Sequence, residues 1–293
     1  MWNKFSPNRV IWDLWDISFS FFDENVHKPY FILIKNEKEE GILPLWWDNE
    51  SKEYRYFGGG FTENRSFWFD LKYFSVIFEA IPEGTKIYDI NEKSAEPSII
   101  AYPHLGNFVE KDDFRYFLNI EKLNSSFDEY LKTLSNTHRK KFRQDIKKIE
   151  NIKHSIEWCG NECFDDLVRF NVKRFGDQSD LSDRFFTESL NKLFSYLEKE
   201  KMLQVSVFKI NEEVEGIQYA AFYEGIYYVI QGGYNLDIKN LGKFLITEQI
   251  KRAISLNAKE IDFMCGEKDS WKALWNFETE QYYNLKKQPS MKN

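Results

Sequence analysis

Residues 202–264 decide the fold of this chain: MLQVSVFKINEEVEGIQYAAFYEGIYYVIQGGYNLDIKNLGKFLITEQIKRAISLNAKEIDFM. Three strand-like runs separated by short turns come first, at 202–210, 214–223 and 226–230. Apolar residues then recur at helical spacing from residue 243 onward, and 260–264 is a short apolar strand. A strand, a helix and a strand in this order form a crossover, so the run from 226 and the strand at 260–264 are predicted to be parallel.

The first half of the chain has the same order of elements. Its predicted strands are 30–35, 41–47, 53–57 and 86–90, with a turn at 36–40, a glycine bend at 58–60 and a helix at 68–80. Gly59 precedes Lys86 by 27 residues, and Gly233 precedes Glu260 by 27 residues. We therefore expect an α/β (α+β) protein built from a duplicated unit, with domains at 1–118 and 119–293.

The segment between the two halves is predicted to be one helix over 125–150, with Ser126 and Glu129 as a capping box. Its second half carries six lysines and arginines, whereas the whole chain has a formal net charge of -7. This concentration is typical of a solvated helix face, or of a face that binds phosphate or an acidic sugar. We select Arg139 and Arg143 as candidates for binding an anionic ligand. Further helices are expected at 162–175, 182–199 and 270–275, and a last strand at 280–285.

Composition narrows the possible functions. Of the 293 residues, 18% are aromatic, which excludes an aromatic-poor disordered chain. The acidic net charge excludes a globally basic protein that coats DNA. No run approaches the ~18 apolar residues of a membrane helix, and the first residues lack the pattern of a signal peptide, so we expect a cytoplasmic protein without an integral membrane segment. Three cysteines and four scattered histidines indicate neither a disulfide framework nor a metal site.

The predicted crossover locates a candidate ligand site. In open α/β sheets, ligands bind at the carboxyl ends of parallel strands, where the connections diverge. Here that position is the gap between the run ending at 230–233 and the strand at 260–264, and the predicted helix directs its amino-terminal end, with unpaired N–H groups, toward it. The cofactor-binding candidates are Gln231, Gly232, Gly233, Leu241, Gly242 and Lys243.

The second half resembles the core of GNAT acyltransferases, and the whole chain is similar to the double-GNAT proteins of the CelD/BioF2-like acetyltransferase family. The similarity rests on three segments, EEGILPLWW with FGGGFTENR, then FDEYLKTLSNTHRKKFRQDIKKIE, then EIDFMCGEKDSWKALWN. Two positions depart from the family pattern. Trp271 stands where the family has Tyr, and DIKNLG lacks the full acyl-CoA loop.

This resemblance implies tandem GNAT-like domains, each a mixed, mostly antiparallel sheet with flanking helices, of which the second holds the donor and the first is degenerate. The implied activity is transfer of an acyl group from acyl-CoA, with acetyl-CoA as the first candidate and no metal. The acceptor would be an amine on a small molecule or on a glycan- or lipid-linked precursor of the cell envelope. Fem-type transferases share the architecture, so charged tRNA is an alternative donor. A non-catalytic binding module is a third interpretation.

The resemblance also assigns roles to residues near the carboxyl-terminal end. Lys272, in an aromatic-Lys pair with Trp271, would assist the developing oxyanion or contact a phosphate. Asp262 would orient Lys272 or accept a proton, with Glu267 and Asp269 as alternative bases. Trp271 and Trp275 are each expected to pack or to stack on the acceptor, and Trp271 is retained as a candidate for contacting substrate. Cys265 is not expected to act as a nucleophile, because GNAT enzymes transfer the acyl group directly.

Overall fold

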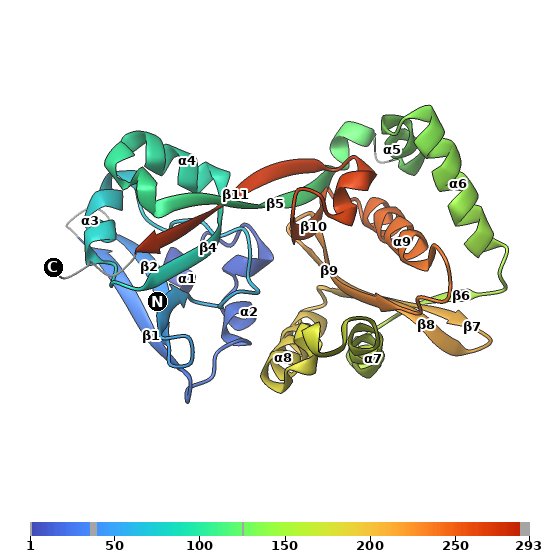
Figure 1. The fold of residues 1–293 in the computed structure, drawn as a ribbon, viewed down its shortest axis with the longest axis horizontal. Helices are drawn as coiled ribbons and strands as arrows, with labels where there is room; N and C mark the ends of the chain where they lie inside the picture. The colour runs from blue at the N-terminus through green and yellow to red at the C-terminus, as the bar shows by residue number, and fades with distance from the viewer. Residues whose placement is uncertain (1, 36–39, 125, 288–293) are drawn as a thin grey trace. The chain divides into compact units, whose positions relative to one another are not determined.

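The computed structural model describes residues 2–35, 40–124 and 126–287, so most of the turn predicted at 36–40 lies outside the described residues. Contacts within the chain define two units (Figure 1). The first contains the residues up to 115 together with 265–268 and those from 279 onward. The second contains 116–264 and 269–278.

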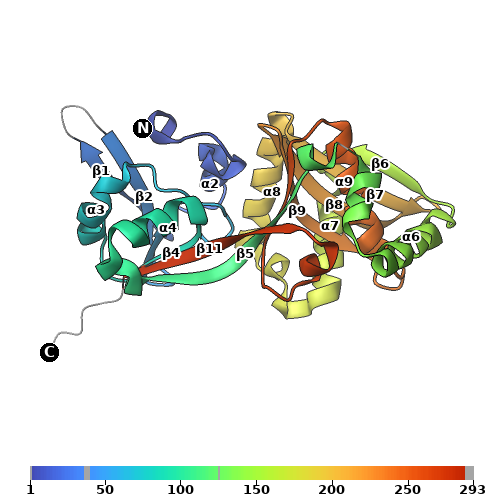
Figure 2. The ribbon, with the colours of Figure 1, turned by 90° about the horizontal axis from the view of Figure 1, so that it is seen from above.

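The first unit contains the predicted meander and crossover. The strands are β1 (His27–Lys35), β2 (Glu40–Asp48), β3 (Glu53–Tyr56), β4 (Thr85–Asn91) and β11 (Glu278–Lys287). The strand β2 pairs antiparallel with both β1 and β3, and β4 is parallel to β3, as the sequence predicted. The last strand, β11, pairs antiparallel with β4, and Figure 2 shows the two side by side.

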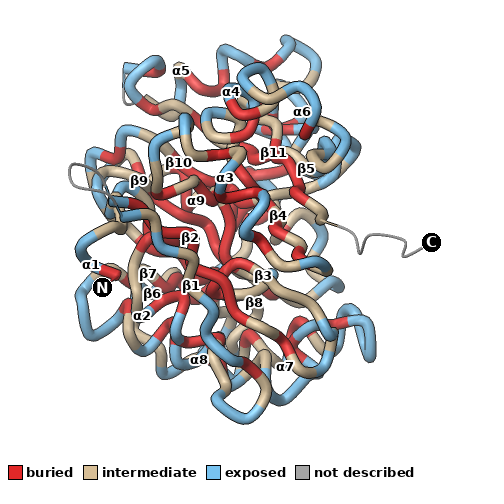
Figure 3. Tube along the Cα trace, turned by 90° about the vertical axis from the view of Figure 1, so that its left-hand side faces the viewer, coloured by how far each residue is buried: buried red, intermediate tan, exposed pale blue. Residues whose placement is uncertain are grey.

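Helices cover this sheet. The helices α3 (Phe74–Ala80) and α4 (Glu92–Ala101) contribute to a core with β2, in which Leu43, Leu45 and Ile77 are buried. The helices α1 (Trp2–Phe5) and α2 (Trp15–Phe19) were not predicted, and they belong to an aromatic cluster that includes Trp46 and Phe57. In Figure 3, β2 is coloured as buried along much of its length.

The helix predicted at 68–80 begins later than expected. Ile42 N donates a 3.0 Å hydrogen bond to the carbonyl of Trp68, so Trp68 lies in an isolated β-bridge. The Asp70 side chain then accepts a 3.0 Å hydrogen bond from Lys72 N and caps a short 3-10 turn (Leu71–Tyr73) that leads into α3. The prediction was therefore wrong at its amino-terminal end, because Trp68 pairs with a distant strand.

The second unit repeats the order of the first. Its strands are β6 (Ser155–Cys159), β7 (Leu203–Ile210), β8 (Glu213–Tyr223), β9 (Ile226–Tyr234) and β10 (Glu260–Gly266). From β6 to β9, each strand pairs antiparallel with the next one along the chain. The helix α9 (Leu241–Ser255) connects β9 to β10. The strand β10 is parallel to β9, which confirms the predicted crossover. The strand β5 (Val109–Asn119) supplies residues to both units.

Helices lie on both sides of the strands of the second unit (Figure 1). The helix α7 (Phe164–Phe175) packs on one face, where a Cβ atom at Gly233 would meet Phe170. The helix α9 packs on the other, where a Cβ atom at Gly216 would meet Leu245. Three further helices complete the unit, α5 (Phe127–Thr133), α6 (Asn136–Glu150) and α8 (Arg184–Lys199). Both α5 and α6 contact α9.

The single helix predicted at 125–150 is two helices. Leu134 is extended, with φ -77° and ψ 146°, and ends α5. The Ser135 side chain then accepts a 3.3 Å hydrogen bond from His138 N and caps α6. Ser126 caps α5 as predicted, by accepting from Glu129 N. The apolar pattern continues through the break because Leu134 is itself buried.

Candidate active site

The strands β9 and β10 form a fork. Their parallel register pairs Glu260–Asp262 with Ile226–Tyr228 and ends there. On its other side, β9 continues to pair with β8, and the register shifts so that Ile230 has no direct partner. A bulge of this kind increases local twist and bends the strand. The backbone of β9 beyond Tyr228 therefore separates from β10.

The amino-terminal end of α9 has hydrogen-bond donors to offer a ligand. Asn240 precedes the helix in a left-handed conformation and provides no side-chain cap. Leu241 N donates to Ile238 O, and Phe244 N donates to Asn240 O. Within the described parts of the chain, the N–H groups of Gly242 and Lys243 have no acceptor. Free N–H groups and the dipole of this 15-residue helix suit a phosphate group.

The three glycines selected from the sequence are required by close packing. A Cβ atom at Gly242 would lie 2.5 Å from Cζ of Tyr234. At Gly232 it would lie 2.2 Å from Oε1 of Gln218, and at Gly233 it would lie 2.7 Å from Cβ of Phe170. The absence of side chains thus lets the helices and neighbouring side chains approach β9 closely.

Two buried amides that the sequence analysis missed hold the end of β9. Nε2 of Gln218 donates to the carbonyl of Gln231 at 2.8 Å. Nδ2 of Asn171, on α7, donates to the carbonyl of Gly232 at 3.0 Å. Both amides are buried, so each carbonyl gains a partner that water would not supply. In the sequence, the only sign of these two residues was a polar side chain within an apolar strand or on an apolar helix face.

Lys243 contacts a neighbouring helix. Its Nζ lies 2.6 Å from Oδ2 of Asp145 on α6. Burial would raise the pKa of Asp145, but the hydrogen bonds and charges of Lys243 and Lys148 outweigh it and lower that pKa. The candidate phosphate contact through Lys243 would therefore compete with an ion pair that joins α6 to α9.

Asp262 and Lys272 converge on the backbone of one residue. Asp262 is 1% exposed, and its Oδ1 accepts a 2.8 Å hydrogen bond from Met264 N. Nζ of Lys272 donates to Met264 O at 3.3 Å and lies 5.9 Å from the ring centroid of Tyr116. Met264 has φ 66°, a left-handed conformation that is strained for this residue type. The two side chains together fix the backbone where β10 leaves β9.

The residues that follow β10 differ in exposure. Glu267 and Asp269 are exposed. Cys265 N donates a 2.7 Å hydrogen bond to Oε2 of the buried Glu63, which the sequence analysis did not select. Trp271 is 47% exposed. Trp275 is buried and stacked on Phe277, so of its two alternatives it has the packing role.

The two selected arginines lie on α6. Arg139 donates to Oδ1 of Asn136 on the same helix. Nη2 of Arg143 lies 3.4 Å from Oδ1 of Asp128 on α5, and both side chains are largely exposed. Exposed ion pairs of this kind are weak, so Arg143 can exchange Asp128 for a bound anion. Lys140, Lys141 and Lys147 are also exposed and have no ion-pair partner in the described part of the chain.

The segment that contains the candidate site is similar to a known family of domains. Residues 136–273 match the family model described as an acetyltransferase (GNAT) domain. The matched segment contains the fork, α6 and α9. A comparison with curated protein sequences gave no significant match.

Solved structures extend the likeness to the whole chain. FemX is 12% identical, with a TM-score of 0.63, and 96% of this chain aligns with 94% of FemX. A tandem GNAT protein from the clavulanic acid biosynthesis pathway is 8% identical, with a TM-score of 0.55 and coverage of 99% and 94%. L-PGS from Bacillus licheniformis is 11% identical, with a TM-score of 0.55 and coverage of 89% and 84%. The chain thus has the tandem GNAT fold, which confirms the predicted fold class.

Among the residues that the structure describes, no helix has the length and apolar character needed to cross a membrane. The described side chains also contain no group of three or more His, Cys, Asp and Glu residues arranged to hold a metal ion.

Proposed function

We propose that this chain is an N-acyltransferase that binds acyl-CoA, with acetyl-CoA as the first candidate, in the fork between β9 and β10. The observation that carries the proposal is the early end of the β9–β10 register, with the free N–H groups of Gly242 and Lys243 at the start of α9. The donor pyrophosphate would bind these N–H groups. The amide arm of the donor would lie along the separated backbone of Gln231–Gly233.

The proposed reaction is direct transfer. The amine lone pair attacks the thioester carbonyl, its proton passes to a base, and the carbon–sulfur bond breaks to release the CoA thiolate, which then takes up a proton. Lys272 would stabilise the oxyanion, and Asp262 would position Lys272 through Met264. Glu267 is the proposed base, and the exposed Asp269 is an alternative.

The proposed acceptor is an amine on a glycan- or lipid-linked precursor, or on a small molecule. Arg139 and Arg143 would bind its anionic group, and Trp271 would contact its apolar part. The proposal places the reaction in the cytoplasm. A second candidate, transfer from charged tRNA, is favoured by the unpaired lysines of α6, because exposed cations are the groups that contact a phosphate backbone.

The test is a donor screen by native mass spectrometry and calorimetry, with acyl-CoAs and charged tRNA offered separately. Saturable binding of an acyl-CoA is expected. Binding of tRNA alone would instead support the second candidate, and binding of neither would indicate a non-catalytic module. With hydroxylamine as a surrogate amine, thiol release should fall about 10²-fold in Lys272→Met while donor affinity is kept. The matched control is Lys173→Met, which alters an exposed lysine of α7 in the same unit. Wild-type thiol release in Lys272→Met would refute the role given to Lys272.

A further inference from the structure

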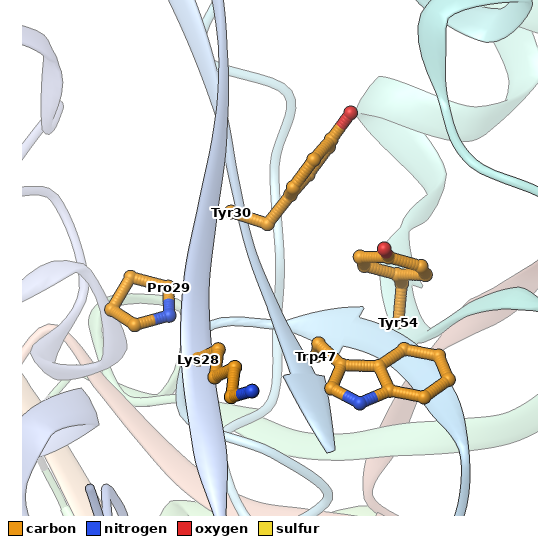
Figure 4. Close-up of a pocket in the computed structure, with 5 residues that line it drawn as sticks. All are labelled: Lys28, Pro29, Tyr30, Trp47 and Tyr54. Carbon is orange, nitrogen blue, oxygen red and sulfur yellow. The ribbon is translucent and has the colours of Figure 1, made fainter. Parts of the chain in front are cut away.

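A hollow lies in the first unit (Figure 4). Its lining residues come from three adjacent strands, and they are Lys28, Pro29 and Tyr30 of β1, Trp47 of β2 and Tyr54 of β3. Lys28 pairs directly with Trp47 across β1 and β2, and Trp47 pairs with Tyr54 across β2 and β3. Residues paired in this way share one face of a sheet, so the register itself brings these side chains together.

Three aromatic rings form the surface of the hollow. The rings of Tyr30 and Tyr54 lie 5.0 Å apart at 63°, and those of Trp47 and Tyr54 lie 4.8 Å apart at 57°. Tyr30 is 40% exposed. Because the rings are tilted and do not form a parallel stack, ring faces as well as ring edges border the hollow. An aromatic surface of this kind contacts the C–H groups of a ligand.

Three polar groups at this hollow have no partner among the residues that the structure describes. Within the described residues, the hydroxyl groups of Tyr30 and Tyr54 have no hydrogen-bond partner, and the ammonium group of Lys28 has no ion pair. The indole N–H of Trp47, by contrast, donates to Oδ1 of Asn49 at 2.9 Å. The hollow thus offers a ligand aromatic surface, two hydroxyl groups and one cation.

We propose that this hollow binds an acidic saccharide. A sugar ring presents apolar C–H groups to aromatic rings and hydroxyl groups to the tyrosines, while a carboxylate or phosphate on the sugar would pair with Lys28. The cavity volume is about 260 Å³, below the ~300–1,000 Å³ of typical small-molecule sites, so it accommodates a single substituted ring. A purely apolar ligand would leave the Lys28 ammonium and both hydroxyl groups without partners.

The proposed saccharide site has no role in the proposed transfer reaction. It uses no residue of the fork, and it would give the first unit a binding activity of its own. The expected binding needs no acyl donor. The result of the donor screen therefore does not affect the proposal that this hollow binds a saccharide.

The test measures binding of two defined probes to the full chain by calorimetry and saturation-transfer NMR. The acidic probe is a tetrasaccharide of alternating glucuronic acid and N-acetylglucosamine, and the neutral probe is tetra-N-acetylglucosamine. Saturable binding of the acidic probe is expected. Tyr30→Ala should weaken it about three- to tenfold through loss of ring contact. Lys28→Gln should weaken it about two- to fivefold and remove the preference over the neutral probe.

Each variant has a matched control on the same strand. Leu33→Ala removes another exposed apolar side chain of β1, and Lys35→Gln makes the same change as Lys28→Gln at an exposed lysine outside the hollow. Both controls should bind like the wild type, and thermal unfolding should show that all four variants fold. Absence of saturable binding would overturn the proposal. Unchanged binding by Tyr30→Ala, or equal affinity for both probes, would overturn it as well.

Discussion

The buried carboxyl group of Asp89 makes the stability of the protein depend on pH. Asp89 is 8% exposed, and burial raises its pKa from 3.8 to about 6 even though the charge of Arg65 lowers it. Because the folded pKa is raised, the stabilisation is complete below pH 3.8 and is lost as the pH rises through 6. Asp89→Asn stays neutral at every pH. The free energy of unfolding of this variant, relative to the wild type, should therefore rise by about 2.4 kcal/mol between pH 4 and pH 7.

Chemical denaturation at several pH values checks this prediction. Asn also tolerates the left-handed backbone of residue 89, where φ is 53°, so the substitution adds little strain. Asp16→Asn is the control, because Asp16 is exposed in the same unit. Parallel stability profiles for Asp89→Asn and the wild type would contradict the argument.

Some residues of the candidate site could be predicted from the sequence, and others could not. The crossover motif led to Asp262 and Lys272, and the structure brings both to Met264. Gln218 and Asn171 were missed because their importance depends on which carbonyls they reach, and Gln231 and Gly232 are distant in sequence from Asn171. A buried amide can be recognised in a sequence, but its partner cannot.

At the scale of elements, the pairing of α6 with α9 rests on a partly buried ion pair. Asp145 is 9% exposed and Lys243 26% exposed in their side chains. Asp145→Asn should lower the free energy of unfolding at pH 7 by about 1–2 kcal/mol, because the Lys243 ammonium loses its partner. The pKa of Asp145 is lowered by Lys243, so the stabilisation exists above pH 3.8 and is lost as the pH falls below that value.

The control for this element is a similar pair in an exposed position. Asp128 pairs with Arg143 between α5 and α6, and both side chains are more than half exposed. Asp128→Asn should therefore change the free energy of unfolding by less than about 0.5 kcal/mol. Denaturation of the two variants at pH 7 and pH 3 compares them directly. Equal losses at pH 7 would show that burial of Asp145 contributes nothing.

Elements predicted from local patterns were mostly correct, and the errors have a common cause. The strands of both meanders and the helix α9 follow periodicity in the sequence, and the structure confirms them. The start of α3 and the break between α5 and α6 were wrong. In both places an apolar side chain, Trp68 or Leu134, is buried by tertiary contacts while its backbone is extended. Periodicity reports burial, and it cannot show that the backbone has left the helix.

At the scale of the whole molecule, the two units are not continuous in sequence. The expected division at residues 118 and 119 assigned the last strand to the second domain. In the structure β11 pairs with β4, and its Leu285 is fully buried in the first core beside Tyr283. The hydroxyl group of Tyr283 also donates to Oε1 of Glu96 on α4 at 2.8 Å. The sequence of β11 predicts a strand, but it does not show which strand β11 pairs with. Its place in the first unit could therefore not be predicted from local patterns.

The first unit should therefore be unable to fold without β11. Removing the buried side chains of Tyr283 and Leu285 should cost about 2–5 kcal/mol each, against a total stability of about 5–15 kcal/mol for a domain. The loss of β11 also leaves the β4 edge unpaired. A fragment of residues 1–118 should lack cooperative unfolding and dispersed NMR signals. The same fragment joined to residues 278–287 by a flexible linker should recover both, whereas a version carrying Tyr283→Ser and Leu285→Ser should not. Cooperative folding of 1–118 alone would show that the first unit is complete without its returning strand.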